Sequence, residues 1–225
     1  GAGHIGSGMV RELIKRVPAT EVVVADKNLE EARHLAAELG DKTSAYSVDA
    51  NDPKSLVSVM KDVDVAINAI GPYYAYGVKV LRAAIKAKTN FVDVDDDYDA
   101  TKACLGLHEE ARKAGITAII GLGATPGLTN LLAKYGSSKL DEVDEIHTSW
   151  AWTAMDPFMG PAIIAHYFHA SSGDVPTYRD GGWVEVPALS ESEVVRFPPP
   201  LGEIEVYNVG HPEPVTIPRY IKGVK

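Results

Sequence analysis

The chain contains the stretch Gly1-Ala2-Gly3-His4-Ile5-Gly6, which leads directly into a helical pattern from Ser7 to Arg16. Glycines in this spacing permit a tight turn, let backbone N–H groups approach a pyrophosphate, and place that anion at the positive end of the following helix. Glycine loops also occur as plain strand-to-helix turns, so the residues that follow must decide between the two interpretations.

The segment after this helix favours a dinucleotide site. An apolar run, Val22–Ala25, ends in Asp26, 20 residues after Gly6. A carboxylate at this place accepts the ribose hydroxyls of NAD and repels the 2′-phosphate of NADP. NAD is therefore the predicted cofactor. NADP stays open, because the adjacent Lys27 is a cation that can tolerate the 2′-phosphate. The predicted cofactor contacts here are Gly1, Gly3, His4, Ile5, Gly6, Asp26 and Lys27.

Short apolar runs alternate with helical patterns up to residue 138. The runs are 22–25, 45–48, 63–70, 91–94 and 117–120, and the helical patterns are 7–16, 29–39, 78–87 and 100–114. Continuous apolar strands separated by helices indicate a parallel sheet covered on both faces, a doubly wound α/β Rossmann fold. Because such a glycine loop follows a first strand, we expect that strand to be absent from this chain, which we interpret as a piece of a longer protein.

The remaining residues follow another pattern. Ten of the 14 prolines lie after residue 150. Parallel βαβ units accommodate proline poorly, because it removes a backbone hydrogen bond from a helix or sheet. Period-two segments at 145–152 and 203–207 predict strands, and a proline-first pattern predicts a helix over 161–170. We therefore expect a Rossmann domain over 1–138 and a smaller α+β domain over 139–225, incomplete at its C-terminal end.

Further candidate residues stand at predicted strand ends, which in such sheets face the ligand crevice. Asp49 is either a contact to the adenine amino group or a turn residue, and both stay open. Gly71-Pro72 lets the backbone approach the nicotinamide ribose. A second turn with Pro126-Gly127 starts another helix. These segments add the cofactor candidates Asp49, Asn68, Ala69, Gly71, Pro72, Thr125, Pro126 and Gly127.

Two residues are candidates for catalysis. Tyr73 follows the Gly71-Pro72 turn and could supply a phenol to substrate, although such tyrosines more often cover an apolar surface. His211 lies in Gly210-His211-Pro212-Glu213-Pro214. Imidazoles in general titrate near neutral pH, which suits proton exchange with a substrate amine. The alternative is a structural loop in which His211 packs against Tyr207 and Tyr220. Other polar candidates in this part are His147, His166, His169 and Glu213.

An acidic run after the fourth predicted strand raises the question of a metal site. It comprises Asp93, Asp95, Asp96, Asp97 and Asp99. The glycine and distant glutamate of a calcium loop are not placed correctly, and helix N-capping before Ala100 explains Asp97 and Asp99. Asp93 and Asp95 are candidates to face the cleft. No metal is predicted.

Charge and composition narrow the class of partner. Acidic residues outnumber basic ones by 31 to 22, giving a net charge of −9, which argues against a nucleic-acid or anionic-membrane partner. The single cysteine, Cys104, forms no internal disulfide, and no apolar stretch reaches membrane-spanning length. These features predict a cytoplasmic protein.

Taken together, four segments resemble the saccharopine dehydrogenase-like family, which includes saccharopine reductases and lysine 6-dehydrogenases. They are 1–6, 68–73, 113–117 and 124–130, with a fifth, patchier similarity at 210–216. The Pro-Gly-Leu-Thr-Asn turn combined with Gly-Pro-Tyr is the more specific part. Saccharopine reductases commonly carry Asp where this chain has Thr125, which puts a saccharopine or lysine substrate in doubt.

The resemblance implies an NAD(P)-dependent oxidoreductase that transfers hydride at a C–N bond of a small amino-acid-derived substrate. It also implies a second domain that binds substrate and mediates a homodimer. The alternative is a non-catalytic dinucleotide-binding sensor or structural dimer, because Rossmann folds host many functions. A sensor needs no titrating group in the cleft, whereas C–N chemistry needs a proton donor or acceptor.

Overall fold

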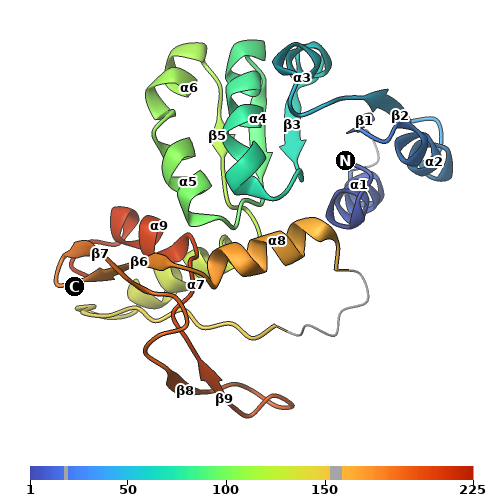
Figure 1. Cartoon of the computed structure of the whole chain (residues 1–225). Coiled ribbons are helices and arrows are strands. Elements are labelled where there is room, and N and C mark those ends of the chain that lie inside the picture. Colours follow the sequence, from blue (N-terminus) through green and yellow to red (C-terminus); the bar gives the residue numbers. More distant parts are fainter. Residues whose placement is uncertain (18–19, 153–158, 225) are drawn as a thin grey trace. The chain divides into compact units, whose positions relative to one another are not determined.

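The structure is a computed structural model that describes residues 1–17, 20–152 and 159–224 (Figure 1). The chain divides into two compact units, one of residues 1–93 and 104–120 and the other of residues 94–103 and 121–225. The boundary between the two units after residue 120 lies earlier in the chain than the domain boundary expected at 138. The reason is that helix α7 (Leu128–Ser137) contacts helix α9 (Glu213–Tyr220) within the second unit.

The first unit consists of parallel strands and helices. Its strands are β1 (Val22–Asp26), β2 (Thr43–Ser47), β3 (Val65–Asn68), β4 (Asn90–Asp93) and β5 (Ala118–Ile119). Its helices are α1 (His4–Arg16), α2 (Leu29–Leu39), α3 (Pro53–Met60), α4 (Tyr73–Ala87) and α6 (His108–Ala114). Strands pair in the orders β1-β2 and β3-β4-β5, all parallel. The predicted α/β class with Rossmann-like sheets is confirmed.

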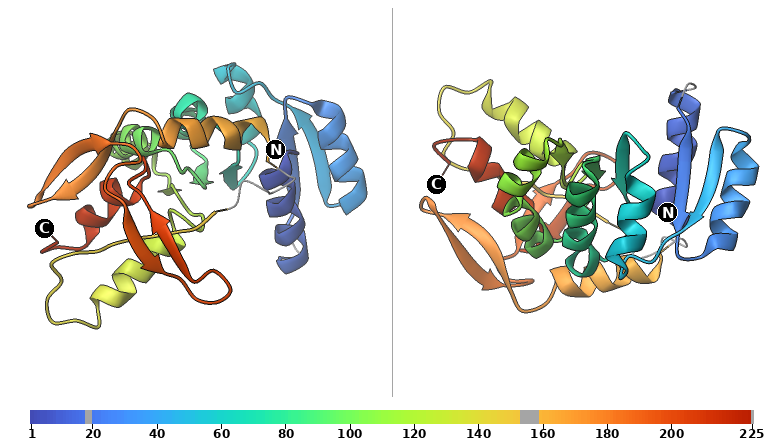
Figure 2. Two further views of the ribbon diagram at one scale, coloured as in Figure 1. Left: turned by 60° about the horizontal axis from the view of Figure 1, so that its bottom comes forward. Right: turned by 90° about the horizontal axis from the view of Figure 1, so that it is seen from above.

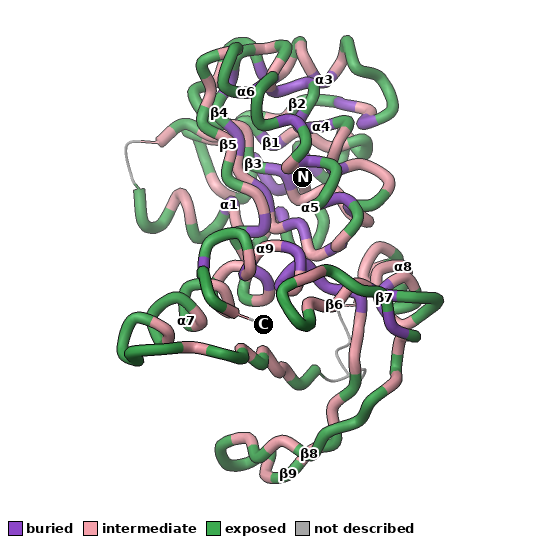
Figure 3. Tube along the Cα trace, turned by 90° about the vertical axis from the view of Figure 1, so that its left-hand side faces the viewer, coloured by how far each residue is buried: buried purple, intermediate pink, exposed green. Residues whose placement is uncertain are grey.

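Two apolar clusters hold this unit together. Val24 of β1 packs with Val10 of α1 and with Leu35 of α2. The larger cluster joins α3, α4 and β4 around the fully buried Phe91. Buried residues recur at helical spacing in α2, at Ala32, Leu35 and Ala36, and Figure 3 colours the chain by burial. The predicted strands and helices arise because their apolar residues, spaced three and four apart in the helices, meet in these clusters.

One predicted helix is two. Instead of a single helix over 100–114, α5 (Tyr98–Leu105) ends before α6 begins at His108. Gly106 lies at the break, where its conformational freedom weakens a continuous helix. Leu107 caps α6 and packs in the larger apolar cluster, which fixes the break.

The second unit contains α7, α8 (Pro161–Ala170), α9 and two antiparallel hairpins, which Figure 2 shows from two sides. The hairpins are β6 (Asp174–Arg179) with β7 (Gly182–Pro187), and β8 (Glu193–Arg196) with β9 (Glu203–Val206). The turn between β6 and β7 is Asp180-Gly181, both with positive φ, as two-residue hairpins require. The predicted antiparallel α+β character, the helix over 161–170 and the strand near 203–207 are confirmed.

The strand predicted over 145–152 is wrong. These residues have no regular secondary structure. A period-two pattern gives a strand only where a neighbour completes its hydrogen bonds, and the β-strands described in this unit pair within their own hairpins. Among the described helices, none has both the length and the apolar character to cross a membrane.

Candidate functional site

The glycine loop and the end of β1 are joined through Asp26. The Ala2 N–H donates to Asp26 Oδ2 at 2.7 Å, and the Asn28 N–H donates to Asp26 Oδ1 at 2.9 Å. Gly3 is the N-cap of α1, whose first turn contains no acidic residue. The structure thus brings together the loop, Asp26 and a helix N-terminus that no side chain caps, and backbone N–H groups at a helix N-terminus are what an anion-binding loop uses.

Two glycines of this loop differ in what an added side chain would contact. A Cβ on Gly6 would lie 2.3 Å from the carbonyl oxygen of Gly1, so the turn itself excludes a side chain. A Cβ on Gly3 would meet no atom within 4 Å. The fold therefore does not require glycine at position 3, whereas close approach of a ligand would.

Lys27 and Asp49 lie at neighbouring strand ends. Lys27 Nζ is 3.3 Å from Asp49 Oδ2, and the Asn51 N–H donates to Asp49 Oδ1 at 2.9 Å. The Asn51 N–H and Lys27 lower the pKa of the exposed Asp49 carboxyl. Asp49 therefore serves as a turn residue, and its contact to adenine stays a prediction.

The end of β3 presents a buried amide. Asn68 Oδ1 accepts the Ile70 N–H at 3.0 Å, while its buried Nδ2 finds no hydrogen-bond partner among the described residues. Ala69, Gly71 and Pro72 form the turn that follows, with Pro72 as the N-cap of α4. Tyr73 is buried, and its hydroxyl donates to the Asn68 carbonyl oxygen at 3.5 Å.

A second turn, before α7, is built inside the second unit. Gly127 has φ +118°, and a Cβ there would lie 2.4 Å from the Gly123 carbonyl oxygen. The Gly127 N–H donates to Asn130 Oδ1, and Asn130 Nδ2 donates to Thr216 Oγ1 of α9. The Thr125-Pro126-Gly127 turn is thereby tied to the start of α9.

Glu213, the first residue of α9, is the centre of this unit's polar site. Its Oε1 accepts the hydroxyls of Thr125 at 2.7 Å and Thr129 at 2.6 Å, and its Oε2 is 2.5 Å from His211 Nδ1. The Glu213 and His211 side chains are 3% and 5% exposed. Burial acts to raise the pKa of Glu213, but the hydrogen bond and charge of His211 and the two threonine hydroxyls lower it from 4.5 to about 2. Glu213 is therefore a carboxylate at neutral pH.

The rings around His211 differ from those expected. His211 contacts Trp150, with ring centroids 5.3 Å apart, and His166, with centroids 5.8 Å apart. The Tyr207 hydroxyl donates to Glu205, and Tyr220 is exposed. The alternative that His211 packs on Tyr207 and Tyr220 is therefore replaced by a polar and aromatic surrounding.

His166 of α8 belongs to the same site and was not predicted with its partner. Its Nδ1 lies 2.7 Å from Asp97 Oδ1 and 3.5 Å from Asp96 Oδ1. Burial lowers the pKa of His166, but the hydrogen bond and charge of Asp97 and the charge of Asp96 raise it overall. Burial raises the pKa of Asp96. The sequence offers no local signal for this pair, because 69 residues separate Asp97 from His166.

The aspartates of the acidic run have different hydrogen-bond partners. Asp99 lies in the first turn of α5, where its Oδ1 accepts the N–H of the next residue, Ala100, so it is not the predicted N-cap. Asp97 directs its Oδ1 to His166. Asp95 is buried, and its carboxylate accepts the Asp97 N–H and the Thr101 hydroxyl. Asp93 is buried as well. Ligand atoms of Asp96, Asp97 and His166 lie within 4.8 Å of one another, but the short contact is accounted for as a hydrogen-bonded pair.

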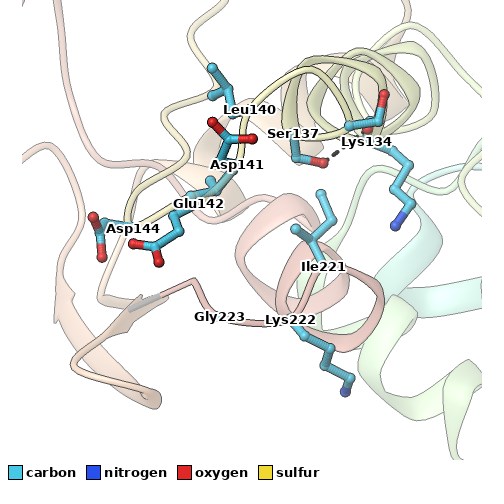
Figure 4. A pocket seen from close by; sticks show the side chains of 11 residues that line it. Lys134, Ser137, Leu140, Asp141, Glu142, Asp144, Ile221, Lys222 and Gly223 are labelled. Carbon is cyan, nitrogen blue, oxygen red and sulfur yellow. Dashed lines mark hydrogen bonds between the residues drawn. The ribbon is translucent and has the colours of Figure 1, made fainter.

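A surface pocket lies elsewhere in the second unit. It has a volume of about 470 Å³ and is lined by the end of α7, the residues after it and the residues that follow α9 (Figure 4). Asp141, Glu142 and Lys222 are among its lining residues, and no predicted site residue is. The polar site around Glu213 is therefore the stronger candidate for chemistry.

Comparison with known proteins identifies the family. The family described as saccharopine dehydrogenase NADP binding domain matches residues 1–119. Carboxynorspermidine synthase of Vibrio alginolyticus is 29% identical over 80% of this chain and 46% of its own length. Saccharopine dehydrogenase [NADP(+), L-glutamate-forming] of Saccharomyces cerevisiae is 34% identical over 64% of this chain and 30% of its own length. The chain thus spans about half or less of these relatives.

A solved structure agrees in fold. Apo saccharopine dehydrogenase (L-Glu forming) from Saccharomyces cerevisiae superposes with a TM-score of 0.63 at 22% identity, covering 92% of this chain and 48% of that one. The likeness extends over both compact units, whereas the family match ends at residue 119. The chain belongs to the saccharopine dehydrogenase NADP-binding domain family.

Proposed function

We propose that this chain is part of an NAD(P)-dependent oxidoreductase that transfers hydride at a C–N bond of an amino-acid- or polyamine-derived substrate. The observation that carries the proposal is the buried pair of His211 and Glu213. A buried carboxylate that accepts two hydroxyls and an imidazole is costly to assemble for a purely structural end, and C–N chemistry needs such a proton-transfer group. The names of the relatives supply the substrate classes.

His211 is assigned the proton-transfer step. Because Glu213 is ionised, it accepts a hydrogen bond from the Nδ1–H of His211 and so selects the tautomer with a free Nε2. Thr125 and Thr129 hold Glu213 from the other side, which fixes the direction of the imidazole. His211 Nε2 then takes a proton from a substrate ammonium, or returns one, while Glu213 stabilises the imidazolium.

The first unit is assigned the cofactor. The uncapped N-terminus of α1 and the free space at Gly3 fit a pyrophosphate, and the unpartnered Nδ2 of Asn68 fits a carbonyl or hydroxyl acceptor of the nicotinamide half. A nicotinamide cofactor supplies the hydride chemistry when bound. The remaining predicted contacts, His4, Ile5, Ala69, Gly71 and Pro72, are proposed to line the same edge.

For the choice of cofactor we propose NADP(H), against the NAD preference expected from Asp26. The family description and the yeast relative's name both specify NADP. Both Asp26 oxygens already accept hydrogen bonds from backbone N–H groups, one of the glycine loop and one of Asn28. The carboxylate therefore stabilises the loop in the absence of a ribose. Lys27, exposed beside it, is the proposed partner of the 2′-phosphate. The homodimer, the cytoplasmic location and a catalytic function of Tyr73 stay predictions.

The test is a screen of amino acids and diamines, each with NAD and with NADP, read by nicotinamide absorbance in the natural-length protein. We expect turnover with NADP and a loss of at least about 100-fold in His211→Ala. His147→Ala is the matched control, because His147 is an exposed histidine of the same unit. Tight NADPH binding without turnover of any amine would instead support the sensor.

A further inference from the structure

Two segments of the first unit meet where β1 and β2 end. The strands pair in parallel with Asp26 opposite Ser47, and the Val48 N–H donates to the Asp26 carbonyl oxygen at 3.0 Å, so the segments that follow both strands leave the sheet next to each other. Lys27 directs its Nζ across to Asp49 Oδ2, at 3.3 Å. The cation proposed to bind the 2′-phosphate is therefore already paired with a carboxylate.

The turn after β2 fixes the direction of the Asp49 carboxylate. Its Oδ1 accepts the Asn51 N–H at 2.9 Å, while its Oδ2 faces Lys27. The Asn51 side chain is held in turn from α4, because Lys79 Nζ donates to Asn51 Oδ1 at 3.0 Å. The same ammonium lies over the Tyr76 ring, 5.1 Å from the ring centroid. Asp49 thus stands in a turn that a third element anchors.

The pair of Lys27 and Asp49 is charged and open to solvent. The backbone N–H of Asn51 and the ammonium of Lys27 lower the pKa of the Asp49 carboxyl, so it is ionised at neutral pH. The Lys27 and Asp49 side chains are 77% and 42% exposed. Exposed ion pairs are weak, and a phosphate monoester carries up to about twice the charge of a carboxylate. A phosphate can therefore displace Asp49 from Lys27, at a cost.

The two nicotinamide dinucleotides meet this ion pair differently. The adenosine ribose of NAD ends in neutral hydroxyls, which do not draw an ammonium away from a carboxylate. The 2′-phosphate of NADP needs the ammonium, so the existing ion pair must break when NADP binds. A group that costs free energy with one ligand and not with the other changes specificity, even though it touches neither.

We propose that Asp49 is a positioning residue that sets cofactor specificity through Lys27: its carboxylate competes with the 2′-phosphate for the ammonium and so narrows the preference for NADP over NAD. This inference rests on the proposed function, because it takes Lys27 as the partner of the 2′-phosphate. It gives Asp49 an effect on binding that neither a plain turn nor a contact to adenine would have.

The experiment measures cofactor binding by fluorescence titration in the natural-length protein. Asp49→Asn keeps the side-chain oxygen that accepts the Asn51 N–H and removes the charge that faces Lys27. We expect NADPH to bind about fivefold more tightly and NADH to stay within about twofold of the wild type. Glu30→Gln is the matched control, because Glu30 is an exposed acid of the same unit whose ion-pair partner is Arg33. It should change neither affinity.

A shorter ligand tests the same contact without the nicotinamide half. Adenosine 2′,5′-bisphosphate and AMP differ only in the 2′-phosphate, so calorimetric titration should show tighter binding of the bisphosphate, and not of AMP, in Asp49→Asn. Thermal unfolding without ligand checks that the variant is folded. A gain shared equally by both ligands would contradict the proposal, because AMP offers nothing for which the Asp49 carboxylate competes.

The double variant decides whether Asp49 acts through Lys27. In a Lys27→Ala background, Asp49→Asn should change NADPH affinity by less than about twofold, because no ammonium remains to compete for. A fivefold gain that persists without Lys27 would overturn the competition and show direct repulsion between Asp49 and the phosphate. Weaker binding of both cofactors in the single variant would overturn it as well, by identifying a contact to the shared adenosine. Unchanged binding of both would reduce Asp49 to a turn residue.

Failure of the cofactor assignment has a different signature. If Lys27→Ala alone leaves the ratio of NADPH to NADH affinity unchanged, Lys27 does not bind the 2′-phosphate, and the proposed cofactor contact falls together with this inference. If Lys27→Ala lowers that ratio while Asp49→Asn fails to raise it, the cofactor contact stands and only the inference on Asp49 is overturned.

Discussion

At the scale of single residues, Glu213 sets the pH dependence of the second unit. Its pKa in the folded state is about 2, below the ordinary 4.5, so its contribution to stability is complete above pH 4.5 and is lost as the pH falls towards 2. The difference amounts to about 3 kcal/mol at neutral pH. Glu213→Gln should therefore lower the free energy of unfolding at pH 7, and the gap from wild type should narrow steadily between pH 4.5 and pH 2.

Urea denaturation at several pH values measures this gap. Glu145→Gln is the matched control, because Glu145 is an exposed partner of His147 in the same unit. The control should differ little from the wild type at any pH. A gap for Glu213→Gln that is independent of pH would mean that the carboxylate is not ionised in the folded state at neutral pH.

Lys27 carries the residue-scale prediction on cofactor choice. Lys27→Ala should weaken NADPH binding about tenfold and leave NADH binding within about twofold, because only the 2′-phosphate is expected to pair with this cation. Fluorescence titration with both cofactors measures the two affinities. Lys42→Ala, another lysine of the same unit, is the control. Equal weakening of both cofactors would show that Lys27 acts on the loop and not on the phosphate.

At the scale of elements, substitutions at two glycines of the loop distinguish its contribution to folding from its contribution to ligand binding. Gly3→Val should leave the thermal stability close to wild type, because its Cβ meets nothing within 4 Å, and should abolish NADPH binding by blocking the backbone N–H groups. Gly6→Ala should unfold or strongly destabilise the first unit, because its Cβ would lie 2.3 Å from a carbonyl oxygen. A folded Gly3→Val that binds NADPH normally would reduce the loop to a turn.

The elements also show what sequence patterns can predict. Helix α2 runs from Leu29 to Leu39 as its spacing and Gly40 predict, because apolar periodicity and caps are local signals. The segment 145–152 carries a strand pattern but has no ladder partner, a fact that only the tertiary fold decides. His211 and Glu213 could be singled out from their shared segment. The contacts of Glu213 with Thr125 and of His166 with Asp97 could not, because 88 and 69 residues separate the partners.

At the scale of the whole molecule, the two compact units have separate interiors. Val24, Leu56 and Phe91 belong to the core of the first unit, and Val175 and Val215 are buried in the second. Compact units that each bury their own apolar residues unfold as separate cooperative units. Calorimetry should therefore show two unfolding transitions, one for each unit.

Ligand and variants should assign these transitions. NADPH at 100 times its dissociation constant should stabilise the first unit by about 2.7 kcal/mol, because it binds only the folded state of the unit that carries the glycine loop.

Gly127→Ala should lower the temperature of the second unit's transition, because the φ of +118° and the 2.4 Å approach to a carbonyl oxygen exclude a side chain in the turn that precedes α7. Gly136→Ala, inside helix α7, is the control, since its Cβ meets nothing within 4 Å. A single transition that NADPH and Gly127→Ala both displace as a whole would mean that the units are stabilised only together, and that the polar site around Glu213 depends on the cofactor unit for its stability.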